Sequence, residues 1–173
     1  MKHLTLKDLP EPGENGFRVL IADGEDVTVF LALGEVDDVI LDGGMPGTLT
    51  VRGPGDGDAH RWGPGDGDAV RLGSGDGDAK RRGSGEGGAL RKGSGEGDAI
   101  RSGSGNGDAR RGGSGDGAAI RFGSSDGDAI RSDSGNGYAW RWGSGHGDAW
   151  RSGTGHGHAK RSGTGTGSAD RNE

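Results

Sequence analysis

Apolar residues, glycines and polar residues alternate with a fixed period over residues 53–172, which contain twelve ten-residue repeats without insertion or deletion. The repeat reads Gly-Ser-Gly-Asp-Gly-Asp-Ala-x-Arg-x, where x varies. Because ten is even and the side chains of an extended chain point alternately to two faces, each position keeps the same face in every repeat. A short fixed period of this kind predicts a solenoid of stacked coils.

The odd and even positions of the repeat differ in how much they vary. Position five is always Gly, position seven always Ala and position nine always Arg, whereas position eight holds residues as different as Lys80 and Trp140. A packed interior does not tolerate such variation at equivalent sites, so the odd positions are predicted to lie inside and the even positions outside. The predicted structural ladder is formed by the alanines, such as Ala79, and by Arg61, Arg71, Arg81, Arg91, Arg101, Arg111, Arg121, Arg131, Arg141, Arg151, Arg161 and Arg171.

An arginine in every repeat needs partners if it lies inside, because an unpaired buried charge costs several kcal/mol or more. Its five donors are expected to reach turn carbonyls or the carboxylates at positions four and six. The alternative is a column of arginines along a corner, with their guanidinium groups in water.

Two windings are compatible with the period. One repeat per coil gives a thin rod, and two repeats per coil give a flatter roll of two sheets. The sequence favours one repeat per coil, because the glycine face is too small to need a second sheet. The predicted fold is therefore all-β, a β-solenoid with a small N-terminal β-rich cap.

Residues 1–52 form the predicted capping or attachment region, and residues 53–172 the repeat domain. Residues 17–22, 27–33 and 36–41 have the β-branched and aliphatic residues of strands, and residues 4–10 are expected to form one helical turn that stops at Pro10. Only this region has ordinary apolar content. Its expected role is to cover the first coil, whose open edge would otherwise pair with another chain.

Composition and charge reduce the number of functions that the chain is expected to have. The 43 glycines make the chain glycine-rich, and the absence of cysteine excludes disulfides and thiolate metal sites. The repeats, with the final Glu173, hold 17 of the 21 basic residues and 17 of the 27 acidic residues, so they are neutral where a nucleic-acid binder should be basic. No phosphate-binding loop or catalytic constellation is apparent, and we expect a protein that is not an enzyme.

The sequence gives little information on location. No signal peptide is apparent, because residues 1–3 are followed by a polar stretch, and the longest apolar run, residues 27–33, is too short to span a bilayer. A cytoplasmic or virion-associated location is the default expectation.

The variable positions eight and ten are the strongest candidates for a binding face. Stacked coils would arrange them in rows outside the scaffold, and exposed Trp and Tyr side chains dominate binding hot spots. We expect this face to recognise a macromolecule or to mediate self-association; a structural spacer of a phage or cell-surface appendage is the alternative. The predicted face comprises Trp62, Leu72, Ile100, Ile120, Phe122, Ile130, Tyr138, Trp140, Trp142 and Trp150.

The unit Gly-x-Gly-Asp-Gly-Asp-Ala-x resembles the Gly-Gly-x-Gly-x-Asp-x-U-x nonapeptide of the RTX toxins and exoenzymes, a family of calcium-binding β-rolls. It differs in its period of ten, in Pro, Ser or Thr at the second position, and in the variable residue at the apolar position. The resemblance implies a second possible function, a β-roll that binds Ca²⁺ through position-six carboxylates such as Asp58, Asp68 and Asp78. Without it, no cofactor is expected.

Two further features concern coil geometry. The ten-residue coil is similar to that of midge antifreeze solenoids, although their cysteines and tyrosine ladder are missing here. His146 and His156 occupy position four of successive repeats, and one repeat per coil would place them ~5 Å apart, near enough to share a zinc or nickel ion with His158 or Asp148. Two repeats per coil would place these histidines on opposite faces.

Overall fold

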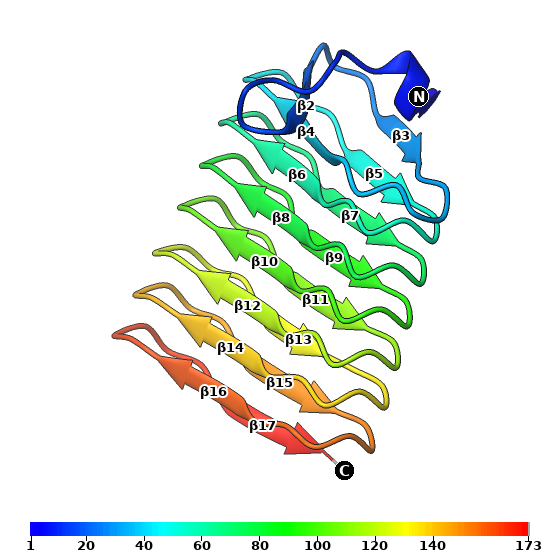
Figure 1. Ribbon diagram of the computed structural model, residues 1–173. Helices are drawn as coiled ribbons and strands as arrows, with labels where there is room; N and C mark the ends of the chain where they lie inside the picture. The colour runs from blue at the N-terminus through cyan, green and yellow to red at the C-terminus, as the bar shows by residue number, and fades with distance from the viewer. Residues whose placement is uncertain (173) are drawn as a thin grey trace.

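The computed structural model describes residues 1–172, which form two parallel β-sheets facing each other across a narrow interior (Figure 1). One sheet has nine strands and the other eight, and successive strands along the chain alternate between the two sheets. The predicted all-β solenoid is therefore confirmed.

The nine-stranded sheet contains β1 (Lys2–Thr5), β3 (Val27–Phe30), β5 (Leu49–Arg52), β7 (Ala69–Leu72), β9 (Ala89–Lys92), β11 (Ala109–Gly112), β13 (Ala129–Arg131), β15 (Ala149–Ser152) and β17 (Ala169–Asn172). The eight-stranded sheet contains β2 (Phe17–Ile21), β4 (Asp38–Asp42), β6 (Ala59–Trp62), β8 (Ala79–Arg82), β10 (Ala99–Ser102), β12 (Ala119–Phe122), β14 (Ala139–Trp142) and β16 (Ala159–Ser162). A short 3₁₀ helix, η1 (Leu6–Asp8), lies where the helical turn was predicted. In the repeats, positions seven to ten form the strands and positions one to six form the turns.

Each coil contains two repeats. Ala79 pairs with Ala59 on one side and with Ala99 on the other, and neither partner belongs to an adjacent repeat. The predicted preference for one repeat per coil was therefore wrong. That preference considered the small size of the glycine face and neglected the length of the arginine side chains, which extend into the interior and need the space between two sheets.

The assignment of odd positions to the interior is confirmed. Between Arg61 and Arg151 every position-nine arginine is at most 1% exposed, and the position-seven alanines of the same coils are equally buried. The alternative, with guanidinium groups in water along a corner, is wrong for these coils. Only at the C-terminal end do Arg161 and Arg171 become half-buried and exposed, respectively.

Residues 1–52 continue both sheets, and their interior is aliphatic. Leu49 pairs with Ala69 and Val51 with Arg71, so aliphatic residues take the places that alanine and arginine occupy in the repeats. Leu31 fills space beside the first repeat, where a Cβ on Gly57 would approach its side chain. The described part of the N-terminal region thus changes from an ordinary apolar core to an arginine-filled interior at the first repeat. The core residues are Leu6, Leu9, Ala22, Val27, Val29, Leu31, Val39, Leu41, Leu49, Val51 and Ala59.

Candidate binding surface

The buried arginines connect neighbouring coils by hydrogen bonds to glycine carbonyls. Arg81 donates from Nε to Gly67 O at 2.9 Å, from Nη1 to Gly63 O at 3.2 Å and from Nη2 to Gly65 O at 2.7 Å. These three carbonyls belong to the turn of the preceding coil, and Nη1 also donates to the carbonyl of Arg82 at 2.7 Å. One guanidinium group therefore satisfies carbonyls of two coils, which explains why the same residue recurs in every repeat.

The glycines of the turn are required by this close packing. A Cβ on Gly75 would overlap the carbonyl oxygen of Gly55 and approach Nη2 of Arg71 at 2.8 Å. Gly83 in addition has a φ of 141°, a value that residues with a side chain rarely adopt. The interior consequently has room for one guanidinium group per turn and for little else.

The column of arginines carries charge without direct carboxylate partners. Burial, together with the neighbouring guanidinium groups of Arg121 and Arg81, lowers the pKa of Arg101 to about 10. A group with this pKa is still protonated at neutral pH. Of the two predicted kinds of partner, the buried arginines therefore bind the glycine carbonyls and not the carboxylates. The aspartates near Arg91, Asp76 and Asp78, act on it only through longer-range electrostatic attraction.

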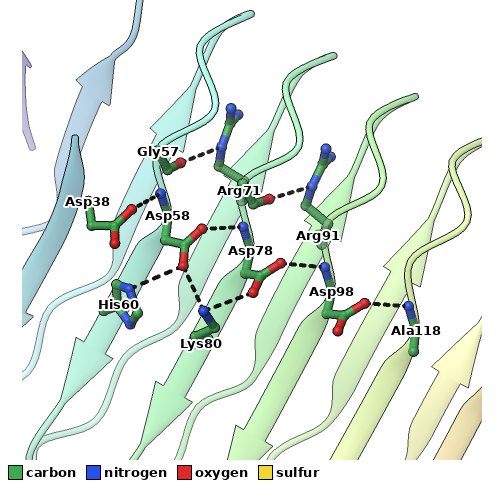
Figure 2. A network of polar contacts seen from close by, with 11 residues as sticks. Asp38, Gly57, Asp58, His60, Arg71, Asp78, Lys80, Arg91, Asp98 and Ala118 are labelled. Carbon is green, nitrogen blue, oxygen red and sulfur yellow. Dashed lines mark hydrogen bonds and ion pairs between the residues drawn. The ribbon is translucent and has the colours of Figure 1, made fainter. Parts of the chain in front are cut away.

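The position-six aspartates form a second ladder. Asp58 Oδ1 accepts the backbone N–H of Asp78, Asp78 Oδ1 accepts that of Asp98, and Asp98 Oδ1 accepts that of Ala118, each at 2.8 Å (Figure 2). On the other sheet Asp68 Oδ1 accepts the N–H of Gly88 at 2.8 Å. The carboxylates suggested as calcium ligands therefore already have a structural role, which is to satisfy a turn amide of the next coil.

Two carboxyl groups of this column differ in their electrostatic surroundings. Burial opposes ionisation of Asp58, but contacts with His60 and Lys80 and the N–H of Asp78 outweigh it and lower its pKa to about 2. Burial raises the pKa of Asp98, because the single N–H of Ala118 does not compensate for the lost hydration. Asp58 is therefore ionised more readily than Asp98.

The variable residues lie outside the scaffold as predicted, but they do not form one surface. Strand alternation places Trp150, Leu72 and Ile130 on the nine-stranded sheet. The other predicted residues belong to the eight-stranded sheet or to the turns that lead into it; they are Trp62, Ile100, Ile120, Phe122, Tyr138, Trp140 and Trp142. The prediction that these residues share one face was wrong for the same reason as the winding, because neighbouring repeats face in opposite directions.

The eight-stranded sheet has an aromatic patch near its C-terminal end, which we define as Ile120, Phe122, Tyr138, Trp140 and Trp142. Tyr138 is 58% exposed, Trp142 54% and Trp140 37%. The ring of Phe122 lies edge-on to both tryptophans, with ring-centre distances of 5.8 Å to Trp140 and 6.0 Å to Trp142. These contacts fix the relative positions of three large rings on a rigid sheet.

The row of carboxylates ends where the aromatic patch begins. After Asp98 the same column continues with Ala118, Tyr138 and His158, and the rings of the last two stack with centres 6.0 Å apart. Ala118 stands where most repeats have an aspartate, and beside it lies a largely apolar hollow of about 330 Å³. It is lined by Ala118, Ile120, Tyr138, Trp140, His158 and Lys160.

Two departures from the repeat occur in the turns that connect β12 to β13 and β13 to β14, next to the strands of the aromatic patch. Asp133 replaces a glycine at position one and has a φ of 78°. Ser125 replaces a glycine at position three, and its Oγ donates to Gly105 O at 2.8 Å. Arg131 Nε and Arg141 Nη1 are the arginine atoms left without a partner among the buried polar atoms of residues 1–172. The scaffold is therefore least completely hydrogen-bonded in the coils that carry the exposed rings.

The two histidines that were predicted to share a metal ion are not brought together. His146 precedes β15 and His156 precedes β16, so their turns lead into opposite sheets. His146 Nδ1 contacts Thr166 Oγ1, and the ring of His158 stacks on Tyr138. In the described part of the chain, the group of side chains suited to a metal ion is instead Asp38, Asp58 and His60.

Sequence reasoning missed Asp38, because it precedes the first repeat. Val39 pairs with Ala59, which places Asp38 in register with Asp58 and thus at position six of a degenerate coil. The only sequence signal was a distance of twenty residues from Asp58, and this has a meaning only when the number of residues per coil is known.

Comparison with known proteins finds no matching family model, no matching curated protein and no matching solved structure. Among residues 1–172, no helix has the length and apolar character that crossing a bilayer requires.

Proposed function

We propose that this chain is a non-enzymatic recognition protein, and that the aromatic patch on its eight-stranded sheet binds an apolar surface of a partner protein. The observation that carries the proposal is the exposure of Tyr138, Trp140 and Trp142 on one face of a rigid sheet, beside an apolar hollow. Contiguous exposed apolar patches mark contact surfaces, and Trp and Tyr dominate binding hot spots.

The contrast between scaffold and surface supports this function. Ala139 and Arg141 alternate with Trp140 and Trp142 along β14, and both are buried like their counterparts in the other central coils. Substituting the outward residues leaves the arginine and backbone ladders unchanged. A repeat protein gains specificity in this way, because its surface varies independently of the interactions that hold the coils together.

The ring geometry favours a protein partner over a polysaccharide. The plane of Phe122 is inclined at 68° to Trp140 and at 84° to Trp142, so the rings do not form the flat platform on which successive sugar rings stack. The Lys160 ammonium lies 5.8 Å from the centre of the Trp140 ring and covers part of it. Inclined rings with a hollow between them instead suit an irregular apolar surface such as a protein side-chain cluster.

A pair of variants on opposite sheets tests the proposal. Trp140→Ser with Trp142→Ser removes two rings of the patch, and Trp150→Ser removes a ring of similar exposure (42%) from the other sheet. Partner binding is measured by affinity capture, and self-association by sedimentation velocity. We expect the first variant to lose the protein partner that wild type captures and any self-association that wild type shows, while Trp150→Ser retains both. Circular dichroism should be unchanged in both variants because the substituted residues lie outside the scaffold.

The outcomes have distinct interpretations. Loss of self-association only in the double variant identifies a second copy of the chain as the partner. Loss of binding to an insoluble glycan, with protein contacts retained, would replace the protein partner by a polysaccharide. If the double variant keeps every partner and its oligomeric state, the recognition function is refuted and the structural spacer remains.

A further inference from the structure

A second site lies at the N-terminal end of the eight-stranded sheet, outside the aromatic patch. Asp38 begins β4, Asp58 precedes β6 in the same register, and His60 projects from β6. One carboxylate oxygen from each aspartate and one nitrogen of His60 all lie within 4.8 Å of one another.

The ladder of hydrogen bonds orients both carboxylates. Asp38 Oδ1 accepts the N–H of Asp58 at 2.9 Å, and Asp58 Oδ1 accepts the N–H of Asp78 at 2.8 Å (Figure 2). Each aspartate is therefore held by one oxygen, which leaves its Oδ2 for other contacts. Metal sites show this arrangement when a backbone group fixes the orientation of a ligating carboxylate.

His60 is the independent observation that points to a ligand. It is 5% exposed, and neither ring nitrogen makes a hydrogen bond. Nε2 lies 3.4 Å from Asp58 Oδ2, in the direction of the carboxylates but without hydrogen-bond geometry. The rings of Phe17 and Trp62 pack against it with ring centres 5.5 Å and 5.7 Å away. The Asp58 contact is thus the polar contact of Nε2, and Nδ1 has no partner. A buried imidazole whose nitrogens make no hydrogen bond is unfavourable, and a metal ion would satisfy it.

We propose that Asp38, Asp58 and His60 bind a divalent transition-metal ion of the Zn²⁺ class. Imidazole nitrogen and carboxylate oxygen are ligand types that zinc accepts, and three protein ligands leave the fourth position for water. Calcium does not suit the site, because it takes six to eight oxygen ligands and the set here includes a nitrogen. The site rests on residues that the proposed recognition function does not use.

Lys80 occupies the position of a competing cation. Its Nζ lies 2.6 Å from Asp58 Oδ2 and 2.8 Å from Asp78 Oδ2 (Figure 2). A bound metal ion would displace the ammonium group from Asp58, and Lys80 would keep its ion pair with Asp78. Removing the ammonium group should therefore strengthen metal binding, an effect that a purely structural role of the aspartates does not predict.

The test is a titration of the full-length chain with Co²⁺, followed by visible absorption and then by Zn²⁺ competition. We expect one equivalent of Co²⁺ to give the intense bands of a tetrahedral N/O site, and Zn²⁺ to remove them. Lys80→Met should bind Co²⁺ about tenfold more tightly. Asp38→Asn should bind it at least about tenfold more weakly, since even outer partners of metal ligands are worth roughly 10–100-fold.

Asp38→Asn is a conservative variant, because asparagine accepts the same ladder hydrogen bond elsewhere. Asn136 Oδ1 accepts the N–H of His156 at 2.7 Å in the corresponding ladder of position-four residues. His60→Gln should abolish the bands, and His146→Gln, at an exposed histidine, is the matched control. Bands that persist in both His60→Gln and Asp38→Asn would overturn the site. So would the absence of bands from Lys80→Met in millimolar Co²⁺.

Discussion

Substituting Arg81 by lysine should weaken the solenoid far more than the same change at Arg82. Arg81 is fully buried and donates to three glycine carbonyls of the preceding turn, whereas Arg82 is exposed and lies over the Trp62 ring at 5.9 Å. Both substitutions keep the positive charge. Their difference therefore measures the planar geometry of the guanidinium group and its burial.

The magnitude follows from the number of bonds. Hydrogen bonds to a charged group are each worth about 1.5–3 kcal/mol. A lysine ammonium, at the end of an unbranched side chain, is expected to keep roughly one of the three bonds to glycine carbonyls. Arg81→Lys should thus lower the free energy of unfolding by about 3–6 kcal/mol. Arg82→Lys should change it by less than about 1 kcal/mol, in the range of exposed cation–π contacts.

Urea denaturation followed by circular dichroism measures both variants, and hydrogen exchange localises the effect. Repeat arrays can unfold in segments, so the amides of residues 63–68 and 83–88 should lose protection first in Arg81→Lys. Equal losses of stability in the two variants would refute the assignment of coil-to-coil cohesion to the buried guanidinium groups.

Three further predictions follow from the winding and from the carboxylates. Deleting residues 103–112 should move every later strand to the other sheet, so that Trp140 and Trp142 lie on the face opposite Trp62. Deleting 103–122 should keep these tryptophans on the same face as Trp62. Cross-linking of cysteines introduced at outward positions on either side of the deletion distinguishes the two cases. Because the folded-state pKa of Asp58 is about 2, below its ordinary value of 3.8, its contribution to stability is complete above pH 4–5 and is lost as the pH falls towards 2. Denaturation from pH 5 to 2 should show wild type losing on the order of 1–2 kcal/mol more than Asp58→Asn, a figure reduced for partial solvent screening, and equal slopes would contradict it. EGTA should leave the circular dichroism spectrum and thermal midpoint unchanged, because buried arginines already satisfy the turn carbonyls and turn amides already satisfy the carboxylates that calcium would bind. Unfolding on chelation would instead support the hypothesis of a calcium-binding β-roll.

The glycine-rich chain by itself determined which residues face inwards. Alternation along extended backbone and an even period are local properties, so the burial of Ala79 and Arg81 and the outward position of Lys80 and Trp140 followed from the repeat alone. The approximate positions of β2, β3 and β4 were also readable, because β-branched residues and glycines mark their limits, whereas β1 was not predicted.

The tertiary structure decided how many repeats form a coil and, with it, which distant residues share a surface. Pairing residues ten or twenty positions apart preserves the same inward and outward faces, so the pattern contains no information that separates the two windings. The space required by the guanidinium group between two sheets selects twenty. This choice separates Trp150 from Trp140 and His146 from His156, and it brings Asp38 beside Asp58 and His60, because only side chains in alternate repeats stack on the same side of the solenoid.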